Sequence, residues 1–320
     1  MHMQNLDSLS IVKAAPATLG KILLAIIAIV ALTFGLSACG NSESSSGSKD
    51  AAATSRAADK KDEKQETGTS KVEKIVALDW RYEEILTALG VKPVGIVEIG
   101  KSKEPGTLAG KLTEITSVGQ AKQPNLEIIS SLEPDLILAS PTRHAAIMDQ
   151  LKEIAPTEAY SDATYQDVLK SMDEIAAKVG KEDEAKKVRE DLKAKLEEAK
   201  KAVKPGTRAA LAGWTKNTLY TWVDASFPAS LLKDAGFEYG YEGEKSNIES
   251  KTDVAELTAD KLPEMNLDVL FMYLDVDGFR ETPFAQAVPT IVGVEQDVWS
   301  RARGPLAAEA MLDQIIETAK

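Results

Sequence analysis

The sequence predicts an α/β protein whose folded body has two lobes joined by one long helix. Apolar strands alternate with helical segments from Lys74 onward, which is typical of a parallel sheet covered by helices on both faces. A helical pattern of about 22 residues, at 182–203, interrupts this alternation, and a second α/β set begins directly after it. The 320 residues are enough for about two domains of ~150 residues each.

The N-terminus has the pattern of an export signal. Lys13 and Lys21 precede an uncharged run at 22–36. The run is about 15 residues long, which is shorter than the ~20 residues that span a bilayer. The run leads into Leu36-Ser37-Ala38-Cys39, which resembles the bacterial lipobox, and Cys39 is the only cysteine. We expect 1–38 to be a lipoprotein signal peptide and Cys39 the lipidation site; a short transmembrane anchor is the alternative.

A polar segment follows the cysteine. Residues 40–70 contain no Val, Ile, Leu, Met, Phe, Tyr or Trp, so they cannot bury enough apolar surface to offset the entropy of ordering. We expect 39–71 to be a disordered linker between a lipid anchor and the folded body.

The first lobe is predicted over 72–180. Gly90, Pro156 and Gly180 mark the ends of its helices. The expected elements, in chain order, are strand 75–78, helix 82–89, strands 94–97 and 117–119, helix 126–132, strand 136–139, and helices 145–154 and 165–179.

The bridging helix is predicted over 181–204. Its apolar residues recur every three or four positions: Ala185, Val188, Leu192, Leu196, Ala199 and Val203. At ~1.5 Å per residue it would extend about 33 Å, enough to cross between two lobes. An ordinary surface helix or a short coiled coil is the alternative interpretation.

The second lobe is predicted over 205–320, starting after Pro205-Gly206. Its expected strands are 208–212, 218–221, 269–273 and 291–292, and its expected helices are 228–235 and 305–318.

Composition excludes several classes of function. Lys and Arg total 38 against 50 Asp and Glu, a net charge of −12, which argues against electrostatic nucleic-acid binding. One cysteine and two histidines exclude a multi-cysteine cluster or a metal site with several imidazoles. The chain has no Gly-x-Ser-x-Gly elbow, P-loop or Gly-x-Gly-x-x-Gly motif. These observations favour a binding protein over an enzyme.

Large aromatic and guanidinium side chains gather at predicted strand ends. They are Trp80, Trp214, Trp222, Trp299, Arg81, Arg143, Arg301 and Arg303. In open α/β sheets ligands bind beyond the carboxyl ends of the strands. Arginine pairs with carboxylates and tryptophan supplies rigid apolar walls, so the pattern predicts a site for a planar or anionic ligand. The alternative is that the tryptophans plug the lobe ends and the arginines only solvate loops.

Several segments together resemble the iron–siderophore substrate-binding proteins of ABC importers. They include Val76-Ala77-Leu78-Asp79-Trp80, the segments 86–95 and 132–139, and Gln123-Pro124-Asn125-Leu126-Glu127 after Val118-Gly119. Arg143-His144-Ala145 with Ile154-Ala155-Pro156-Thr157, and Trp299-Ser300-Arg301-Ala302-Arg303-Gly304, resemble the ferric dicitrate and ferric hydroxamate branch. The resemblance covers about 72–320. It implies the helical-backbone periplasmic binding protein fold, with two Rossmann-like lobes and a ligand cleft between them.

The resemblance also implies the ligand and the residues that hold it. Trp80, Arg81, Arg143, Arg301 and Arg303 match the family's cleft positions, and strand-end placement adds Trp214, Trp222 and Tyr273. The ligand would be a ferric siderophore, chelated by its own oxygens, with no further cofactor and no catalysis. Where relatives often carry an arginine, this chain has Gln120-Ala121-Lys122, which leaves the particular siderophore open.

An ABC importer permease is the implied protein partner. Glu127 and Asp260 match the two acidic positions that dock the family onto its permease; as helix-start carboxylates they also have a purely structural explanation. We expect a monomer anchored at the outer face of the cytoplasmic membrane.

Three other functions stay open on the sequence. A haem-binding lipoprotein of the same fold would use His144 with Tyr239, Tyr241 or Tyr273. A zinc or manganese binder would use the same scaffold, but only one histidine follows the signal segment. An exported hydrolase would use acidic pairs that the sequence does not place.

Overall fold

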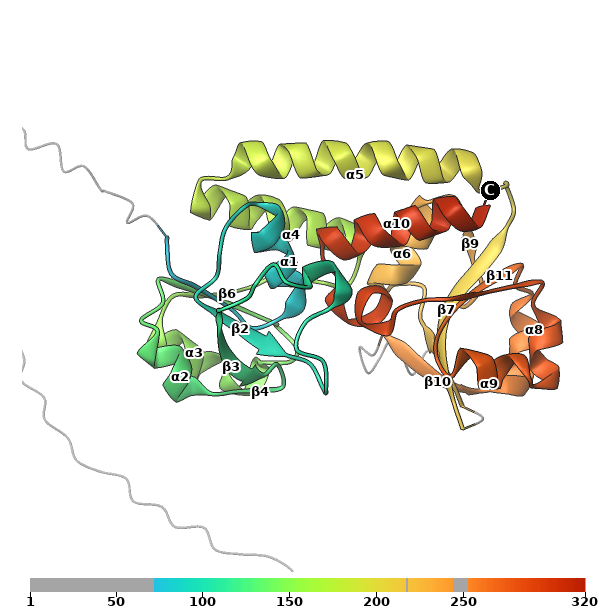
Figure 1. Cartoon of the computed structure of the whole chain (residues 1–320), viewed down its shortest axis with the longest axis horizontal. Helices are drawn as coiled ribbons and strands as arrows, with labels where there is room; N and C mark the ends of the chain where they lie inside the picture. The colour runs from blue at the N-terminus through green and yellow to red at the C-terminus, as the bar shows by residue number, and fades with distance from the viewer. Residues whose placement is uncertain (1–71, 217, 244–252, 320) are drawn as a thin grey trace, which may run out of the picture. The chain divides into compact units, whose positions relative to one another are not determined.

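A computed structural model describes residues 72–216, 218–243 and 253–319 of the chain (Figure 1). The predicted signal peptide, Cys39 and the linker all lie outside the described residues. In the part of the chain that is described, no helix combines the length and apolarity needed to cross a membrane.

The first lobe is built on a mostly parallel sheet. Its strands are β1 Ile75–Ala77, β2 Gly95–Glu98, β3 Thr116–Gln120, β4 Gln123–Pro124, β5 Leu136–Ala139 and β6 Thr157–Ala159. They lie in the order β4-β3-β2-β1-β5-β6, and only the β3–β4 pair is antiparallel. Its helices are α1 Trp80–Ala88, α2 Leu126–Ser131 and α3 Met148–Ile154, with 3-10 turns η1 Gly106–Leu108 and η2 Ala145–Ile147. The alternation expected from the sequence is confirmed, and β4 and β6 are additions to it.

The second lobe has a mixed sheet rather than a parallel one. Its strands are β7 Arg208–Thr215, β8 Thr218–Trp222, β9 Glu238–Tyr239, β10 Val254–Thr258, β11 Val269–Leu274 and β12 Thr290–Gly293. The order is β10-β8-β7-β11-β12, with β9 also on β7; β8 is antiparallel to both β7 and β10. The short connection between β7 and β8 forces a hairpin, because parallel neighbours need a long crossover.

The helices of the second lobe include one irregular turn. They are α6 Phe227–Asp234, α8 Leu262–Met265, α9 Val276–Arg280 and α10 Pro305–Ala319, with 3-10 turns η3 Ala259–Lys261 and η4 Pro283–Ala287 and the π-helical turn η5 Asp297–Ala302. Trp299 lies inside η5 and packs in a stacked arrangement on Phe271, with ring centroids 4.5 Å apart. It therefore belongs to a helical turn and not to a free strand end.

The predicted bridging helix is present as α5 Glu182–Ala202, and α4 Tyr165–Val179 comes directly before it. The start of α4 is fixed by a reciprocal capping box between Thr164 and Asp167, and its end by Gly180 in the left-handed conformation, φ 68°. In Figure 1, α5 runs alongside α4 and α10. The predicted apolar stripe is confirmed, since Ala185, Leu192, Leu196 and Ala199 are buried against these neighbours.

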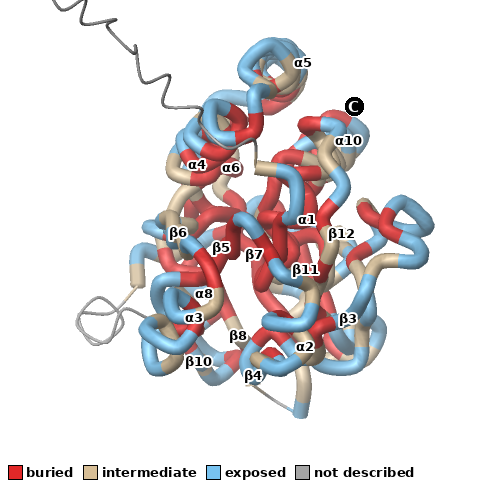
Figure 2. Tube along the Cα trace, turned by 90° about the vertical axis from the view of Figure 1, so that its left-hand side faces the viewer, coloured by how far each residue is buried: buried red, intermediate tan, exposed pale blue. Residues whose placement is uncertain are grey.

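The core is continuous from one lobe to the other. On the first sheet, Ile75 and Ala77 face one side and Val76 and Leu78 the other, as strand alternation requires. The side of Ile75 joins a single apolar cluster that also contains residues of α4, α5, α10 and the second sheet. The buried strands β5, β7 and β11 lie within this interior (Figure 2). A shared core makes the connection between lobes stiff, because packed interiors resist deformation.

Candidate functional site

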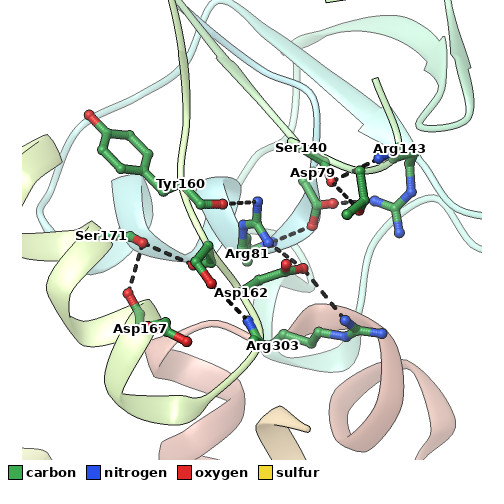
Figure 3. Close-up of polar contacts among 12 residues, drawn as sticks. Asp79, Arg81, Ser140, Arg143, Tyr160, Asp162, Asp167, Ser171 and Arg303 are labelled. Carbon is green, nitrogen blue, oxygen red and sulfur yellow. Dashed lines mark hydrogen bonds and ion pairs between the residues drawn. The ribbon is translucent and has the colours of Figure 1, made fainter. Parts of the chain in front are cut away.

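An alternating chain of arginines and aspartates joins the two lobes. Asp79 follows β1 and forms the N-cap of α1, and Arg143 follows β5. Asp162 lies between β6 and α4, and Arg303 follows η5 in the second lobe. Figure 3 shows Arg81 between Asp79 and Asp162, with its neighbours around it. The carboxyl ends of first-lobe strands therefore meet the segment that follows η5.

Arg81 is the buried centre of this chain. Its side chain is 0% exposed and forms an ion pair with Asp162. Its guanidinium also donates to the Tyr82 hydroxyl at 2.8 Å and to the Tyr160 carbonyl at 3.1 Å, and it lies 4.5 Å from the centre of the Tyr82 ring. A charge so fully desolvated is stable only when paired and hydrogen-bonded, so Arg81 is held in one position.

Arg143 and Asp79 form the second pair. The two side chains make an ion pair in which Asp79 is buried and Arg143 is 28% exposed. Burial would raise the pKa of Asp79, but the charges of Arg143 and Arg81 outweigh it and hold that pKa below its ordinary value. The charge of Arg303 also contributes to this lowering. Asp79 is therefore an ionised carboxylate that is stabilised by the charges of arginines from both lobes.

A buried histidine fixes the loop that carries Arg143. The Ser140 backbone N–H donates to Nδ1 of His144 at 2.8 Å, and Nε2 of His144 lies 2.6 Å from the Ala121 carbonyl, to which it donates. Burial lowers the pKa of His144, which keeps the ring neutral in this arrangement. Both ring nitrogens are engaged within the protein, so His144 does not present a free nitrogen to a haem iron. The haem alternative loses its histidine ligand on this geometry.

Arg303 is the second-lobe arginine of the cluster, and like Arg143 it is partly exposed. Its backbone is left-handed, with φ 54°, and its side chain is 19% exposed. The guanidinium lies 4.7 Å from the centre of the Trp222 ring and forms ion pairs with Asp253 at 2.8 Å and Asp162 at 3.5 Å. Cation–π stacking on an indole and two carboxylates place the guanidinium beside the first-lobe arginines.

Two aromatic side chains lie close to Arg303: Trp222 under its guanidinium, and Tyr273 beside Trp222. Trp222 and Tyr273 are both buried, and burial raises the pKa of Tyr273 against the opposing effect of the Trp222 and Ser300 side chains. Tyr273 lies over Gly213 on the neighbouring strand, where a Cβ would come within 2.5 Å of its ring. Glycine at 213 therefore leaves the space that the Tyr273 ring occupies.

The structure brings together five of the eight residues expected to hold a ligand, and places three elsewhere. Arg81, Arg143, Arg303, Trp222 and Tyr273 are the five. The others are Trp80, Trp214 and Arg301, whose contacts are with other parts of the protein.

Trp80 and Trp214 are core residues rather than cleft walls. Trp80 is fully buried, packs in the first-lobe core, and donates its indole N–H to the Val97 carbonyl at 3.1 Å. Trp214 is also buried, and its ring meets Phe279 edge-on with centroids 5.3 Å apart. A residue type at a strand end does not determine which way the side chain points.

Arg301 pairs locally. It donates to Asp297 one helical turn earlier, at 2.7 Å, and is 31% exposed. Its charge still reaches Tyr273 and offsets part of the rise that burial causes in the pKa of that hydroxyl. Arg301 thus lies at the margin of the cluster.

The expected docking residues lie on exposed turns of different lobes. Glu127 is exposed in the first turn of α2, where the Asn125 side chain accepts the Glu127 N–H at 3.0 Å. Asp260 is exposed in η3, and the Thr258 hydroxyl lowers its pKa. Both carboxylates are available at the surface to a partner.

Sequence reasoning missed the acidic members of the cluster. The carboxylates of Asp79, Asp162 and Asp253 form ion pairs with the arginines that were predicted to bind the ligand. Three surface cavities, of about 300, 650 and 490 Å³, are lined by other residues. Asp79 was within reach of the strand-end argument, because it comes two residues after β1. Among the described residues, no group of three or more His, Cys, Asp and Glu is arranged to hold a metal ion.

Two α/β lobes, a helical connection and a charged aromatic cluster between the lobes define the class of two-lobed substrate-binding proteins. The chain belongs to the periplasmic binding protein family, whose model matches residues 75–291. Members of this family are substrate-binding transport proteins.

Named relatives agree with this assignment. The chain is 29% identical to the Fe(3+)-citrate-binding protein YfmC of Bacillus subtilis (strain 168) over 310 residues, covering 92% of this chain and 96% of that protein. It is 31% identical to the putative ABC transporter substrate-binding lipoprotein YhfQ of the same organism over 265 residues, with coverages of 76% and 82%. The crystal structure of the iron uptake ABC transporter substrate-binding protein PiuA from Streptococcus pneumoniae Canada MDR_19A matches with a TM-score of 0.66 and 27% identity, covering 78% of this chain and 94% of that one.

Proposed function

We propose that this protein captures a ferric siderophore between its two lobes and delivers it to an ABC importer permease. The protein performs no catalysis, because the siderophore's own oxygens chelate the iron. A chelate of the citrate or hydroxamate type fits the relatives and the arginines. Three guanidinium groups from both lobes, held by a chain of ion pairs and one of them stacked on Trp222, are the observation that carries this proposal.

The three arginines differ in exposure, and this supports different roles for them in holding a ligand. Arg81 is buried and keeps the cluster in place, while the partly exposed Arg143 and Arg303 present N–H groups from opposite lobes. Arginine forks bind carboxylate or other chelating oxygens in two parallel hydrogen bonds. A ligand that reaches both arginines would be held by both lobes at once.

Location and partner complete the proposal. Cys39 would carry the lipid anchor at the outer face of the cytoplasmic membrane, and the monomer would extend from it on the 39–71 linker. Glu127 and Asp260 would dock the two lobes onto the permease.

The test is a tryptophan-fluorescence titration of the purified protein with ferric citrate, a ferric hydroxamate, a ferric catecholate and haemin. Because Trp222 lies directly under Arg303, a bound ferric complex should quench its emission. We expect saturable quenching by one ferric chelate and weaker binding by Arg143→Ala. Arg280→Ala is the matched control, since Arg280 is a half-exposed arginine that pairs with Asp277 on α9.

Two outcomes contradict the proposal. Equal affinity in wild type and Arg143→Ala removes Arg143 from the site. A Soret band in the protein as purified, or saturation by haemin alone, assigns the cleft to haem instead.

A further inference from the structure

We propose that Asp253 is a specificity-determining residue of the cleft, whose carboxylate holds Arg303 until an anionic group of the ligand takes its place. This inference rests on the proposed function and deepens it. It assigns the ligand to the ferric chelates that carry negative charge, and it gives a role to a residue that the resemblance did not indicate.

The contacts of Arg303 show which anion holds it. Its Nη1 lies 2.8 Å from Oδ2 of Asp253 and 3.5 Å from Oδ2 of Asp162. Its Nε donates to the Ser300 carbonyl at 3.2 Å, and Trp222 covers one face of the guanidinium. Asp253 is thus the nearest anion to the guanidinium, in the kind of position that a ligand carboxylate would take.

Asp253 is held beside Arg303 by the backbone. The Asp253 carbonyl accepts the Val223 N–H at 2.9 Å, and the next residue, Val254, pairs with Trp222 across the β8–β10 ladder. The strand pairing that places Trp222 under Arg303 therefore places the carboxylate as well. A tethered group acts at an effective concentration near the millimolar range or above, so weakly bound simple anions compete poorly with it.

Solvent exposure distinguishes the Arg303–Asp253 ion pair, which a ligand can replace, from the Arg81–Asp162 ion pair, which it cannot. Asp253 is 41% exposed and Arg303 is 19% exposed, so this ion pair can open without disturbing the core. Arg81, by contrast, is completely buried, and its pairing with Asp162 belongs to the folded structure. An entering chelate would therefore replace Asp253 at Arg303 and leave Arg81 paired.

The charge balance explains why this device would select anionic ligands. Arg81, Arg143 and Arg303 are matched by Asp79, Asp162 and Asp253, so the ligand-free cluster carries no net charge. An uncharged ligand gains nothing from Arg303 while Asp253 occupies it. A chelate with several negative groups can contact Arg143 and Arg303 together and so displace the tethered carboxylate, which smaller anions do not.

The experiment compares wild type, Asp253→Asn and the control Asp277→Asn. Asp277 is an exposed aspartate of the same lobe that pairs with Arg280, so both variants remove one negative charge from one arginine. Each protein is titrated by fluorescence with ferric citrate and a ferric tris-catecholate, both anionic, and with a neutral ferric trihydroxamate, at low and high salt. Thermal unfolding checks the fold, and Asp253→Ser replaces the asparagine variant if that variant does not fold.

Asp253→Asn should bind the anionic chelate about 2- to 5-fold more tightly, the range that a partly exposed ion pair supports. Its affinity should fall more steeply with salt than that of wild type, because the cluster then carries a net positive charge. Binding of the neutral chelate, and all binding by Asp277→Asn, should be unchanged.

The failures are distinguishable. If wild type binds no ferric chelate, the proposed function falls and this inference falls with it. If wild type binds a chelate but Asp253→Asn binds it equally or more weakly, the proposed function stands and the role of Asp253 is overturned. Wild-type binding of the neutral chelate alone also overturns the inference.

Discussion

A buried glutamate provides the sharpest quantitative prediction from this structure. Glu84 lies on α1 in the first lobe and is fully buried. It accepts a hydrogen bond from the Thr107 hydroxyl, and its Oε2 accepts the Ala307 backbone N–H at 2.9 Å, in the first turn of α10. A Cβ at Gly304 would collide with this carboxyl group, so glycine at 304 allows the close approach. Glu84 therefore ties the first lobe to the C-terminal helix.

The environment of Glu84 sets the size of the effect. Burial raises the pKa of Glu84 from 4.5 to about 7, although hydrogen bonds from Thr107, Ala307 and Gly304 oppose the rise. Between these pH values the folded protein holds a proton that the unfolded chain releases. Stability is therefore greatest below pH 4.5 as far as this group is concerned, and it is lost as pH rises through 7. With ~1.36 kcal/mol for each pKa unit, ionised Glu84 costs the folded state about 3 kcal/mol at pH 8.

The substitution that tests this reasoning is Glu84→Gln. The glutamine carbonyl can accept the Ala307 N–H, and its amide can donate to the Thr107 hydroxyl, so the uncharged geometry is kept. Urea unfolding at pH 5 and pH 8 gives the free energy of unfolding of wild type, Glu84→Gln and Glu153→Gln, whose glutamate is exposed on α3. Relative to wild type, Glu84→Gln should gain about 2.5 kcal/mol between pH 5 and pH 8, because a small part of the cost is already present at pH 5, and Glu153→Gln should gain nothing. The same difference at both pH values would refute the reasoning.

Three further predictions concern the cluster and the surface. Arg81→Ala leaves Asp162 without its buried partner and should lower the free energy of unfolding by about 3–5 kcal/mol in urea titrations; a loss below ~1 kcal/mol would contradict its structural role. Because the pKa of His144 is lowered in the folded protein, only the unfolded chain takes up this proton as pH falls below 6.5, so the free energy of unfolding should fall below that pH. His144→Gln should weaken this acid dependence in urea titrations, and an unchanged pH profile would contradict the role given to His144. Glu127→Ala and Asp260→Ala should each leave ferric-chelate affinity within about twofold but reduce ligand-stimulated ATP hydrolysis by the permease in proteoliposomes, and unreduced hydrolysis in both would remove them from the docking surface.

The regular elements were the most predictable part of the fold. Residues 165–179 and 136–139 form a helix and a strand with the boundaries that the sequence predicts. In these segments local signals agree, since a capping box, a glycine stop and an uninterrupted apolar run each favour one structure. The strands β4, β6 and β9 were missed because they have only two or three residues, too few to show a period.

The second sheet contains one strand that the sequence did not reveal. The hairpin expected between Trp214 and Trp222 forms from β7 and β8, because β8 follows β7 too closely for a crossover. Strand β10 then pairs with β8 through an antiparallel ladder over Val254–Thr258. Its pattern is only partly alternating, with one residue, Ala255, buried, so the sequence alone did not reveal it.

The candidate site could be located from the sequence but not assembled from it. Strand-end placement pointed to Arg143 and Arg303, because ligands bind beyond the carboxyl ends of strands in open α/β sheets. It could not separate Trp222, which lies under a guanidinium, from Trp80, which points into the core. Nor could it show that Asp162 and Asp253 neutralise the arginines, because ion pairing depends on side-chain contacts between distant segments.

The central claim is that arginines from both lobes grip one ferric chelate. A crystal structure of the protein loaded with the chelate that quenches its fluorescence tests this most directly. We predict the ligand between the lobes, with Arg143 and Arg303 each within hydrogen-bond distance of it and Arg81 still paired with Asp162. A chelate bound elsewhere, for example in the cavity lined by Val203, Phe237 and Thr318, with both outer arginines still on their aspartates, would contradict the account.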